Sequence, residues 1–77
     1  MAEPTKPRNV RIHGRRTSMR LETPFWAVLE EIARTLEVPV ETLCERIADT
    51  GHRGNLSSAI RVFALAWSRK KARARAN

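Results

Sequence analysis

The feature that most constrains this chain is one short run of strictly alternating polar and apolar residues, 16–22. In an extended chain Thr17, Met19 and Leu21 share one face, and the residues between them share the other. A strand this short is not stable alone, and the sequence after it predicts only helices. Its partner strand must therefore come either from another chain or from residues 9–13, where a weaker alternation is present.

The chain has 77 residues, enough for one small domain. A folded monomer of this size buries only roughly 60% of the surface that its unfolded chain exposes, so its core is marginal. One cysteine cannot form an intrachain disulfide, and no CxxC pair or His/Cys cluster offers a metal site instead. We therefore expect the chain to enlarge its core by self-association.

Helices are predicted after the strand. Thr23 and Pro24 predict the start of the first helix, which ends near Glu37. Pro39 turns the chain and begins a second helix that runs to about Thr50. Apolar residues recur at helical spacing in both, and the predicted inner stripes are Phe25, Leu29, Ile32 and Leu36 in the first helix and Val40, Leu43, Cys44 and Ile47 in the second.

The third predicted helix is apolar almost all round. Asn55 is a good N-cap for it, and it runs through Trp67 toward a basic tail. A helix without a wide polar face must be covered on two sides, so we expect the first two helices on one side and a second subunit on the other. Cys44 and both tryptophans, Trp26 and Trp67, are interpreted as core or interface residues.

Charge divides the chain into three parts. Residues 1–20 carry six basic residues and one acid, residues 21–52 carry two and seven, and residues 53–77 carry seven basic residues and no acid. Such segregation is the electrostatic footprint of nucleic-acid binding, although basic tails also occur as solvated termini or membrane anchors. Two early prolines and little periodicity predict a flexible basic arm over 1–15, followed by a folded domain over 16–67 and a basic tail over 68–77.

Nothing in the sequence predicts an enzyme or a cofactor. It has no Gly-rich phosphate loop, no zinc-binding histidine pair, no paired-carboxylate site and no nucleophile beside a base. The acidic residues are placed where the outer faces of helices need solvation, and His13 and His52 are interpreted as exposed residues without a function.

The amino terminus leads into no apolar segment, and no stretch approaches the roughly 20 apolar residues that span a bilayer. We therefore expect a cytoplasmic protein, and the segregated positive charge predicts that it associates with the nucleoid.

The order of a basic arm, one amphipathic strand and helices resembles the ribbon-helix-helix family of DNA-binding proteins. The resemblance covers residues 16–50 in general layout. Over 15–67 it extends to Arg-Thr-Ser-Met-Arg-Leu-Glu at 16–22, Phe25-Trp26 and Asn-Leu-Ser-Ser-Ala-Ile-Arg-Val-Phe at 55–63, which is similar to a bacterial subgroup of short members.

The resemblance implies a mainly helical homodimer, in which one strand from each subunit pairs antiparallel and the two-stranded ribbon enters the major groove of DNA. It implies a transcription factor, most simply a repressor that occludes a promoter. Base contacts are implied for Arg16, Ser18 and Arg20. Phosphate contacts are expected at Arg11, Arg15, Val40, Glu41, Thr42, Arg69, Lys70 and Lys71, and dimer contacts at Met19, Leu21, Phe25, Leu43, Ile47, Ile60, Phe63 and Trp67.

The sequence departs from the family's pattern at several points. Pro39 stands where a Ser or Thr cap is usual, Glu41 repels a phosphate at the start of the second helix, and Glu22 brings an acid to the end of the ribbon. The third helix is additional to the minimal fold. It can extend the dimer interface, join dimers into a higher-order assembly on tandem DNA sites or bind a partner protein, and it is compatible with two other classes. One is an interaction module, antitoxin-like or an adaptor, in which this helix and the tail hold a partner protein. The other is a trihelical helix-turn-helix domain, which the scarcity of basic residues on the second helix disfavours.

Overall fold

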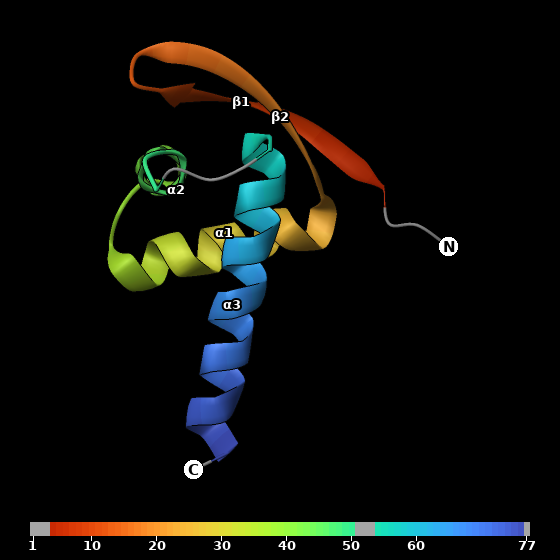
Figure 1. The fold of residues 1–77 in the computed structure, drawn as a ribbon, viewed down its shortest axis with the longest axis vertical. Coiled ribbons are helices and arrows are strands. Elements are labelled where there is room, and N and C mark those ends of the chain that lie inside the picture. Colours follow the sequence, from red (N-terminus) through yellow and green to blue (C-terminus); the bar gives the residue numbers. More distant parts are fainter. Residues whose placement is uncertain (1–3, 51–53, 77) are drawn as a thin grey trace.

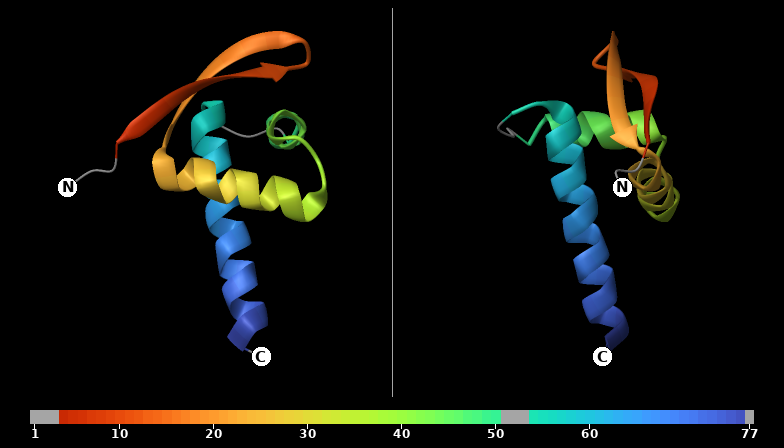
Figure 2. Two further views of the ribbon diagram at one scale, coloured as in Figure 1. Left: turned by 180° about the vertical axis from the view of Figure 1, so that it is seen from behind. Right: turned by 90° about the vertical axis from the view of Figure 1, so that its right-hand side faces the viewer.

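The computed structural model describes residues 4–50 and 54–76, and its elements follow the order β1, β2, α1, α2, α3 (Figure 1). The two strands form an antiparallel hairpin. The hairpin lies across one end of the helices, and the long last helix runs away from it to the opposite end of the molecule (Figure 1 and Figure 2). The fold is therefore a two-stranded ribbon followed by helices, with a helix added at the carboxyl end, as the sequence predicts.

The hairpin consists of β1, Thr5–Ile12, and β2, Arg15–Glu22. The two residues between the strands, His13 and Gly14, both have positive φ, 52° and 80°, as the type I′ hairpin turn requires. β2 contains the predicted strand, and β1 contains residues 9–12 of the weaker alternation. The partner strand therefore comes from the same chain, which is one of the two alternatives that the sequence leaves open.

β1 begins at Thr5, within the segment for which the sequence predicts a flexible arm. The reason is the position of Pro7 in the ladder. Ile12 and Arg15 flank the turn as a hydrogen-bonded pair, and bonded pairs then alternate along the ladder, so the pair that contains Pro7 is not bonded. The nitrogen of Pro7 points away from β2, and its missing N–H removes no ladder hydrogen bond. Residues 1–3 of the predicted arm lie outside the described part of the chain.

The first helix, α1, spans Thr23–Leu36. Its N-cap is Glu22 rather than the predicted Thr23, and no side chain caps it. The Thr23 hydroxyl instead donates to the carbonyl oxygen of Pro4, at 3.5 Å, so it joins the helix to the start of the hairpin. The helix ends at Glu37, as predicted, in a left-handed conformation with φ 57°.

The buried face of α1 is rotated from the predicted stripe. The indole N–H of Trp26 donates to the carbonyl oxygen of Lys6 in β1, at 2.8 Å. Because this bond satisfies the polar atom of the ring, the indole is buried where the stripe predicts Phe25. Leu36, the last predicted member of the stripe, is 42% exposed. The buried residues are Trp26, Leu29, Ile32 and Ala33, and Phe25 is half-buried.

The other two helices are α2, Val40–Ala48, and α3, Leu56–Ala76. α2 buries Leu43, Cys44 and Ile47 of its predicted stripe, and Val40 is half-buried against the core. For α3 the predicted N-cap is confirmed, because the side-chain oxygen of Asn55 accepts from the backbone N–H of Ser58 at 2.8 Å. α3 does not end near Trp67 but continues through the predicted tail, where alanine, lysine and arginine are all strong helix formers.

One core collects side chains from every element. It includes Cys44, whose burial raises the pKa of the thiol to about 11, so the thiol stays protonated at neutral pH, as expected for a core residue. The cluster consists of Val10, Met19, Leu21, Trp26, Leu29, Ile32, Ala33, Leu43, Cys44, Ile47 and Ile60.

Candidate nucleic-acid interface

One face of the hairpin packs against the helices, and the other face is exposed. Met19 and Leu21 of β2 are buried against the helices, and Arg16, Ser18 and Arg20 alternate with them and are exposed. The register places residues of β1 beside the exposed ones on the same face. The facing pairs are Arg11 with Arg16, Asn9 with Ser18 and Pro7 with Arg20, and we call these six residues the outer face of the hairpin.

The sequence predicts the β2 half of the outer face and misses the β1 half. The missing signal is the continuation of the two-residue period from residue 12 back to residue 5, in which Val10 is buried and both Asn9 and Arg11 are exposed. Pro7 hides this period, since proline ordinarily argues against a strand. An alternation read through the proline identifies the β1 half of the face.

Positive charge is concentrated on the hairpin. Residues 5–22 contain six Lys and Arg residues and one acid, Glu22. Arg11 and Arg16 face each other directly, an arrangement that is destabilising for like charges. Neither guanidinium forms an ion pair with any residue that the structure describes. The outer face therefore carries cationic groups to which the described part of this chain supplies no counterion.

The acid of the hairpin is neutralised from α3. The Arg61 guanidinium donates to both carboxylate oxygens of Glu22, with Nε 2.8 Å from Oε1 and Nη2 3.4 Å from Oε2. The hydrogen bond from Arg61 holds the pKa of Glu22 below its usual value. Glu22, which departs from the family's pattern, is therefore a paired anion and leaves no free negative charge at the end of the ribbon.

Three carboxylates on one face of α2 and its C-cap hold the tip of the hairpin. Glu41, Glu45 and Asp49 follow one another at four-residue spacing, which aligns them in a row. Glu41 Oε2 accepts from the backbone N–H of Arg11 at 2.8 Å, and Glu45 Oε2 accepts from that of His13 at 2.7 Å. Asp49 Oδ1 lies 2.7 Å from His13 Nε2. These acids, which the sequence assigns only to solvated surfaces, fasten the hairpin to α2 and cover part of the free edge of β1.

His13 has a role that its exposure conceals. The hydrogen bond to Asp49 and the negative charge of that carboxylate raise the pKa of His13 above its ordinary value of 6.5, and Glu45, 3.9 Å from Nδ1, adds to the effect. His13 is exposed, as expected, but its ring and its backbone both attach the turn to α2, a structural contact that the sequence does not predict. His52 lies outside the described residues.

The start of α2, where the resemblance implies a phosphate clamp, holds an acid. The first backbone N–H groups of a helix lack intrahelical partners and attract anions, and no side chain caps Pro39. Here the Glu41 carboxylate stands in that first turn and is bound to the hairpin. The geometry therefore gives the phosphate contacts expected at Val40, Glu41 and Thr42 no support.

The basic half of α3 is separated from the hairpin. The carboxyl end of α3 lies at the opposite end of the molecule (Figure 1 and Figure 2). Arg69 and Lys70 are exposed there, and Lys71 donates to Glu31 Oε1 at 2.8 Å. These three residues, expected to contact phosphates, do not flank the outer face, whereas Arg11 and Arg15 lie beside the hairpin turn.

Most of the residues expected at a dimer interface lie inside one protomer. The hairpin and α3 of the same chain cover α1 and α2, so these side chains are enclosed without a second subunit. Phe25, Phe63 and Trp67 are half-buried against the core. Fully enclosed are Met19, Leu21, Leu43, Ile47 and Ile60.

Two other kinds of site are absent from the part of the chain that the structure describes. His, Cys, Asp and Glu residues form no group there that can hold a metal ion. None of the helices, within the same residues, is both long and apolar enough to cross a membrane. The outer face of the hairpin is thus the candidate site on which charge and exposure converge.

Comparison with known proteins agrees with this geometry. The model of the ribbon-helix-helix domain family matches residues 5–68, which include β1. The solved structure of an uncharacterized protein from Bordetella pertussis Tohama I is similar, with 39% sequence identity and a TM-score of 0.80. The similarity covers 92% of this chain and 61% of that one, so this chain spans about three-fifths of that protein's length. No curated protein matches the chain. The chain belongs to the ribbon-helix-helix domain family, whose members generally bind DNA as dimers.

Proposed function

We propose that this protein binds double-stranded DNA sequence-specifically as a homodimer and represses transcription by occupying a promoter. The observation that carries the proposal is the difference between the two faces of the hairpin. One face buries Val10, Met19 and Leu21, and the other exposes arginines that have no ion-pair partner among the described residues. The family's general DNA binding supports it. Repression then needs no further chemistry, because a bound dimer excludes other proteins from the same DNA.

The free edge of β2 offers the place for a second copy. From the ladder register, the backbone N–H and C=O groups of Arg16, Ser18 and Arg20 point away from β1. The corresponding edge of β1 is partly covered by Glu41 and contains Pro7, which has no N–H to donate. Two β2 strands that pair antiparallel about a two-fold axis form a self-complementary contact. Their four-stranded sheet has β2 and its symmetry mate at the centre.

The central pair of strands fits the major groove. That groove is about 12 Å wide and admits a two-stranded ribbon, and neighbouring strands lie about 4.8 Å apart. Arg16 and Arg20 then point at base edges, where each guanidinium can donate to O6 and N7 of a guanine, and Ser18 can donate or accept. The flanking β1 strands lie over the groove walls. We therefore assign a phosphate contact to Arg11. We also keep the contact expected of Arg15, which is exposed beside the turn but pairs with Ile12 on the other side of the hairpin.

The test is to select preferred sites from a random duplex library and then to measure variant affinities by fluorescence anisotropy. Arg20→Ala should lose about 1–3 kcal/mol of discrimination between the preferred and a scrambled site. Arg11→Ala should weaken binding to both sites alike. Arg46→Ala, which removes an exposed arginine of α2, is the matched control and should change neither. A site preference that survives Arg20→Ala, or a protein that occupies its site as a monomer in light scattering, contradicts the proposal.

A further inference from the structure

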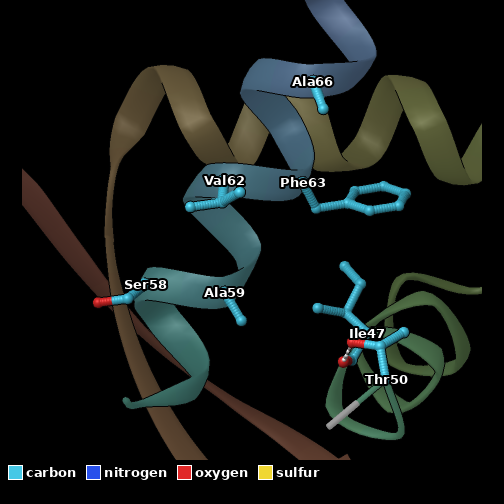
Figure 3. A pocket seen from close by; sticks show the side chains of 7 residues that line it. All are labelled: Ile47, Thr50, Ser58, Ala59, Val62, Phe63 and Ala66. Carbon is cyan, nitrogen blue, oxygen red and sulfur yellow. Dashed lines mark hydrogen bonds between the residues drawn. The ribbon is translucent and has the colours of Figure 1, made fainter. Parts of the chain in front are cut away.

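A shallow groove runs along the outward side of α3 and changes from apolar to basic along its length. Its two parts share Val62 and Ala66 and are therefore continuous. In the first part, Ile47 of α2 lies across from Ala59 and Phe63 of α3 (Figure 3). We call the two parts together the α3 groove. The second part follows α3 beyond α2 and is also lined by Leu65, Arg69, Lys70 and Arg73.

The described part of the chain leaves apolar side chains of the α3 groove exposed. Val62, which lines both parts, is 68% exposed, and Leu65, which lines the second part, is 52% exposed. The first two helices cover the opposite side of α3, where Ile60 and Ala64 are buried. Exposed apolar surface along a groove marks a site of interaction with another molecule.

The basic part of the groove lacks a countercharge. Arg69, Lys70 and Arg73 form no ion pair with any described residue, whereas Lys71, on the side toward α1, pairs with Glu31. No Asp or Glu lines either part of the groove, and the sequence of α3 contains none. The described residues therefore supply no countercharge to this surface.

Charge and shape together select one kind of occupant. A second copy that packs its α3 on this α3 brings no acid, so the three cations stay unmatched. DNA phosphates match the cations but leave Val62 and Leu65 against a polar surface. A helix with an apolar stripe and acidic flanks satisfies both parts, and a helix laid in a groove is a common mode of peptide recognition. The 14-residue step from Ala59 to Arg73 measures about 21 Å, which is the length of a helix of about 14 residues.

We propose that the α3 groove binds an acidic amphipathic helix of a partner protein. The apolar stripe of that helix packs on Val62, Leu65 and Ala66, and its carboxylates pair with Arg69 and Arg73. Because the basic part of the groove lies at the end of the molecule opposite the hairpin, that part stays accessible when the outer face is occupied. The inference does not rest on the DNA-binding function proposed above.

The test uses the full chain and two fluorescent helical peptides of about 16 residues. Both carry the same leucine stripe, and one has glutamate and the other lysine at the flanking positions. The glutamate peptide should bind and the lysine peptide should not. Val62→Ser should weaken the glutamate peptide about fivefold, as expected for partial loss of a buried valine, and Arg73→Glu should weaken it about tenfold or more. Arg16→Glu, a charge-matched reversal on the hairpin, should leave the affinity within about twofold.

Three outcomes overturn the proposal. Equal binding of the two peptides shows that the groove does not select charge. If Val62→Ser binds the glutamate peptide with unchanged affinity, and random duplex DNA displaces that peptide, then α3 binds phosphates rather than an amphipathic helix. A loss of self-association in Val62→Ser, seen by light scattering without peptide, shows that a second copy occupies the groove. Val62 is mostly exposed, so its variant is expected to keep the wild-type melting temperature, and circular dichroism checks this.

Discussion

Two regions of this molecule are strongly basic, the hairpin and the second half of α3, and they differ in what surrounds the charge. On the hairpin, Arg16 and Arg20 stand on the exposed side of a strand whose other side is buried, and the strand pair is fastened to α2 by carboxylates. On α3, Arg69 and Arg73 continue an apolar groove and project from a single helix. By their content of basic residues alone, the two regions are alike.

This difference indicates that the shape and polarity of the surface around a basic side chain predict its partner better than the positive charge alone. A flat polar ribbon with fixed guanidinium spacing matches base edges and phosphates. A groove that is apolar at one end and basic at the other matches a helix with both properties. The two regions lie at opposite ends of the molecule (Figure 2), so the two proposed partners would not compete for one surface.

The largest effect is expected inside the hairpin rather than on α3. Leu21 is fully buried on the inner side of β2, so Leu21→Ala should lower the free energy of unfolding by about 2–5 kcal/mol. Leu65→Ala removes the same atoms from a side chain that is 52% exposed, and it should cost well under 1 kcal/mol. Urea denaturation of both variants gives the comparison. Equal losses would mean that α3 is covered in solution, by a second copy or otherwise.

The next effect separates the two basic regions on DNA. Arg16→Ala should remove about 1–3 kcal/mol of site discrimination, and Arg69→Ala should leave discrimination unchanged. The salt dependence sharpens the contrast. The slope of log affinity against log salt should fall by about 0.9 for each phosphate that Arg11→Ala leaves without its cation, and Arg69→Ala should not change the slope. An equal change of slope in both variants would place the second half of α3 on the same duplex as the hairpin.

A smaller effect tests the fastening of the hairpin. Glu41→Ala removes the acceptor of the Arg11 N–H at an exposed position where water replaces it, so unfolding should become easier by about 0.5–1.5 kcal/mol. Hydrogen exchange of the Arg11 amide should become faster. Glu30→Ala, an exposed acid on α1, makes the same change of charge away from the hairpin. If Glu30→Ala has the same effect on the Arg11 amide, general electrostatics and not the hydrogen bond protects it.

The sequence predicted what depends on local order. The alternation of β2, the α2 stripe and the Asn55 cap each need only near neighbours. The alternation and the cap are confirmed, and so is the stripe apart from the half-buried Val40. The sequence did not predict the features that depend on contacts between residues far apart in the chain. β1 tolerates Pro7 because that residue occupies a position in the ladder where no hydrogen bond to β2 is needed. Trp26 is buried in place of Phe25 because a carbonyl oxygen of β1 accepts from its indole N–H.

The candidate site followed the same rule. Arg16, Ser18 and Arg20 share a face by simple alternation, and the structure exposes all three. Their neighbours on β1 could be identified only with the register, and the function of Glu41, Glu45 and Asp49 only with the packing of α2 beneath the hairpin. A row of acids at four-residue spacing looks the same in sequence whether it faces water or holds backbone N–H groups.

The smallest effect expected is a pH dependence confined to the hairpin. Asp49 raises the pKa of His13 in the folded state, so the contact stabilises fully below the unfolded pKa of about 6.5, and its electrostatic contribution is lost as the pH rises through the folded value. His13→Asn keeps a residue that tolerates positive φ and removes the titration. The difference in unfolding free energy between wild type and this variant should therefore shrink from about pH 6 to pH 8, while His52 is present in both and cancels. Lys71→Ala breaks the pair with Glu31 that attaches α3 to α1 and removes no histidine, so it should change stability by an amount that is constant over the same range. A pH-independent difference for His13→Asn would mean that the hairpin tip is held by its backbone hydrogen bonds alone, and the contrast between the two attachments would disappear.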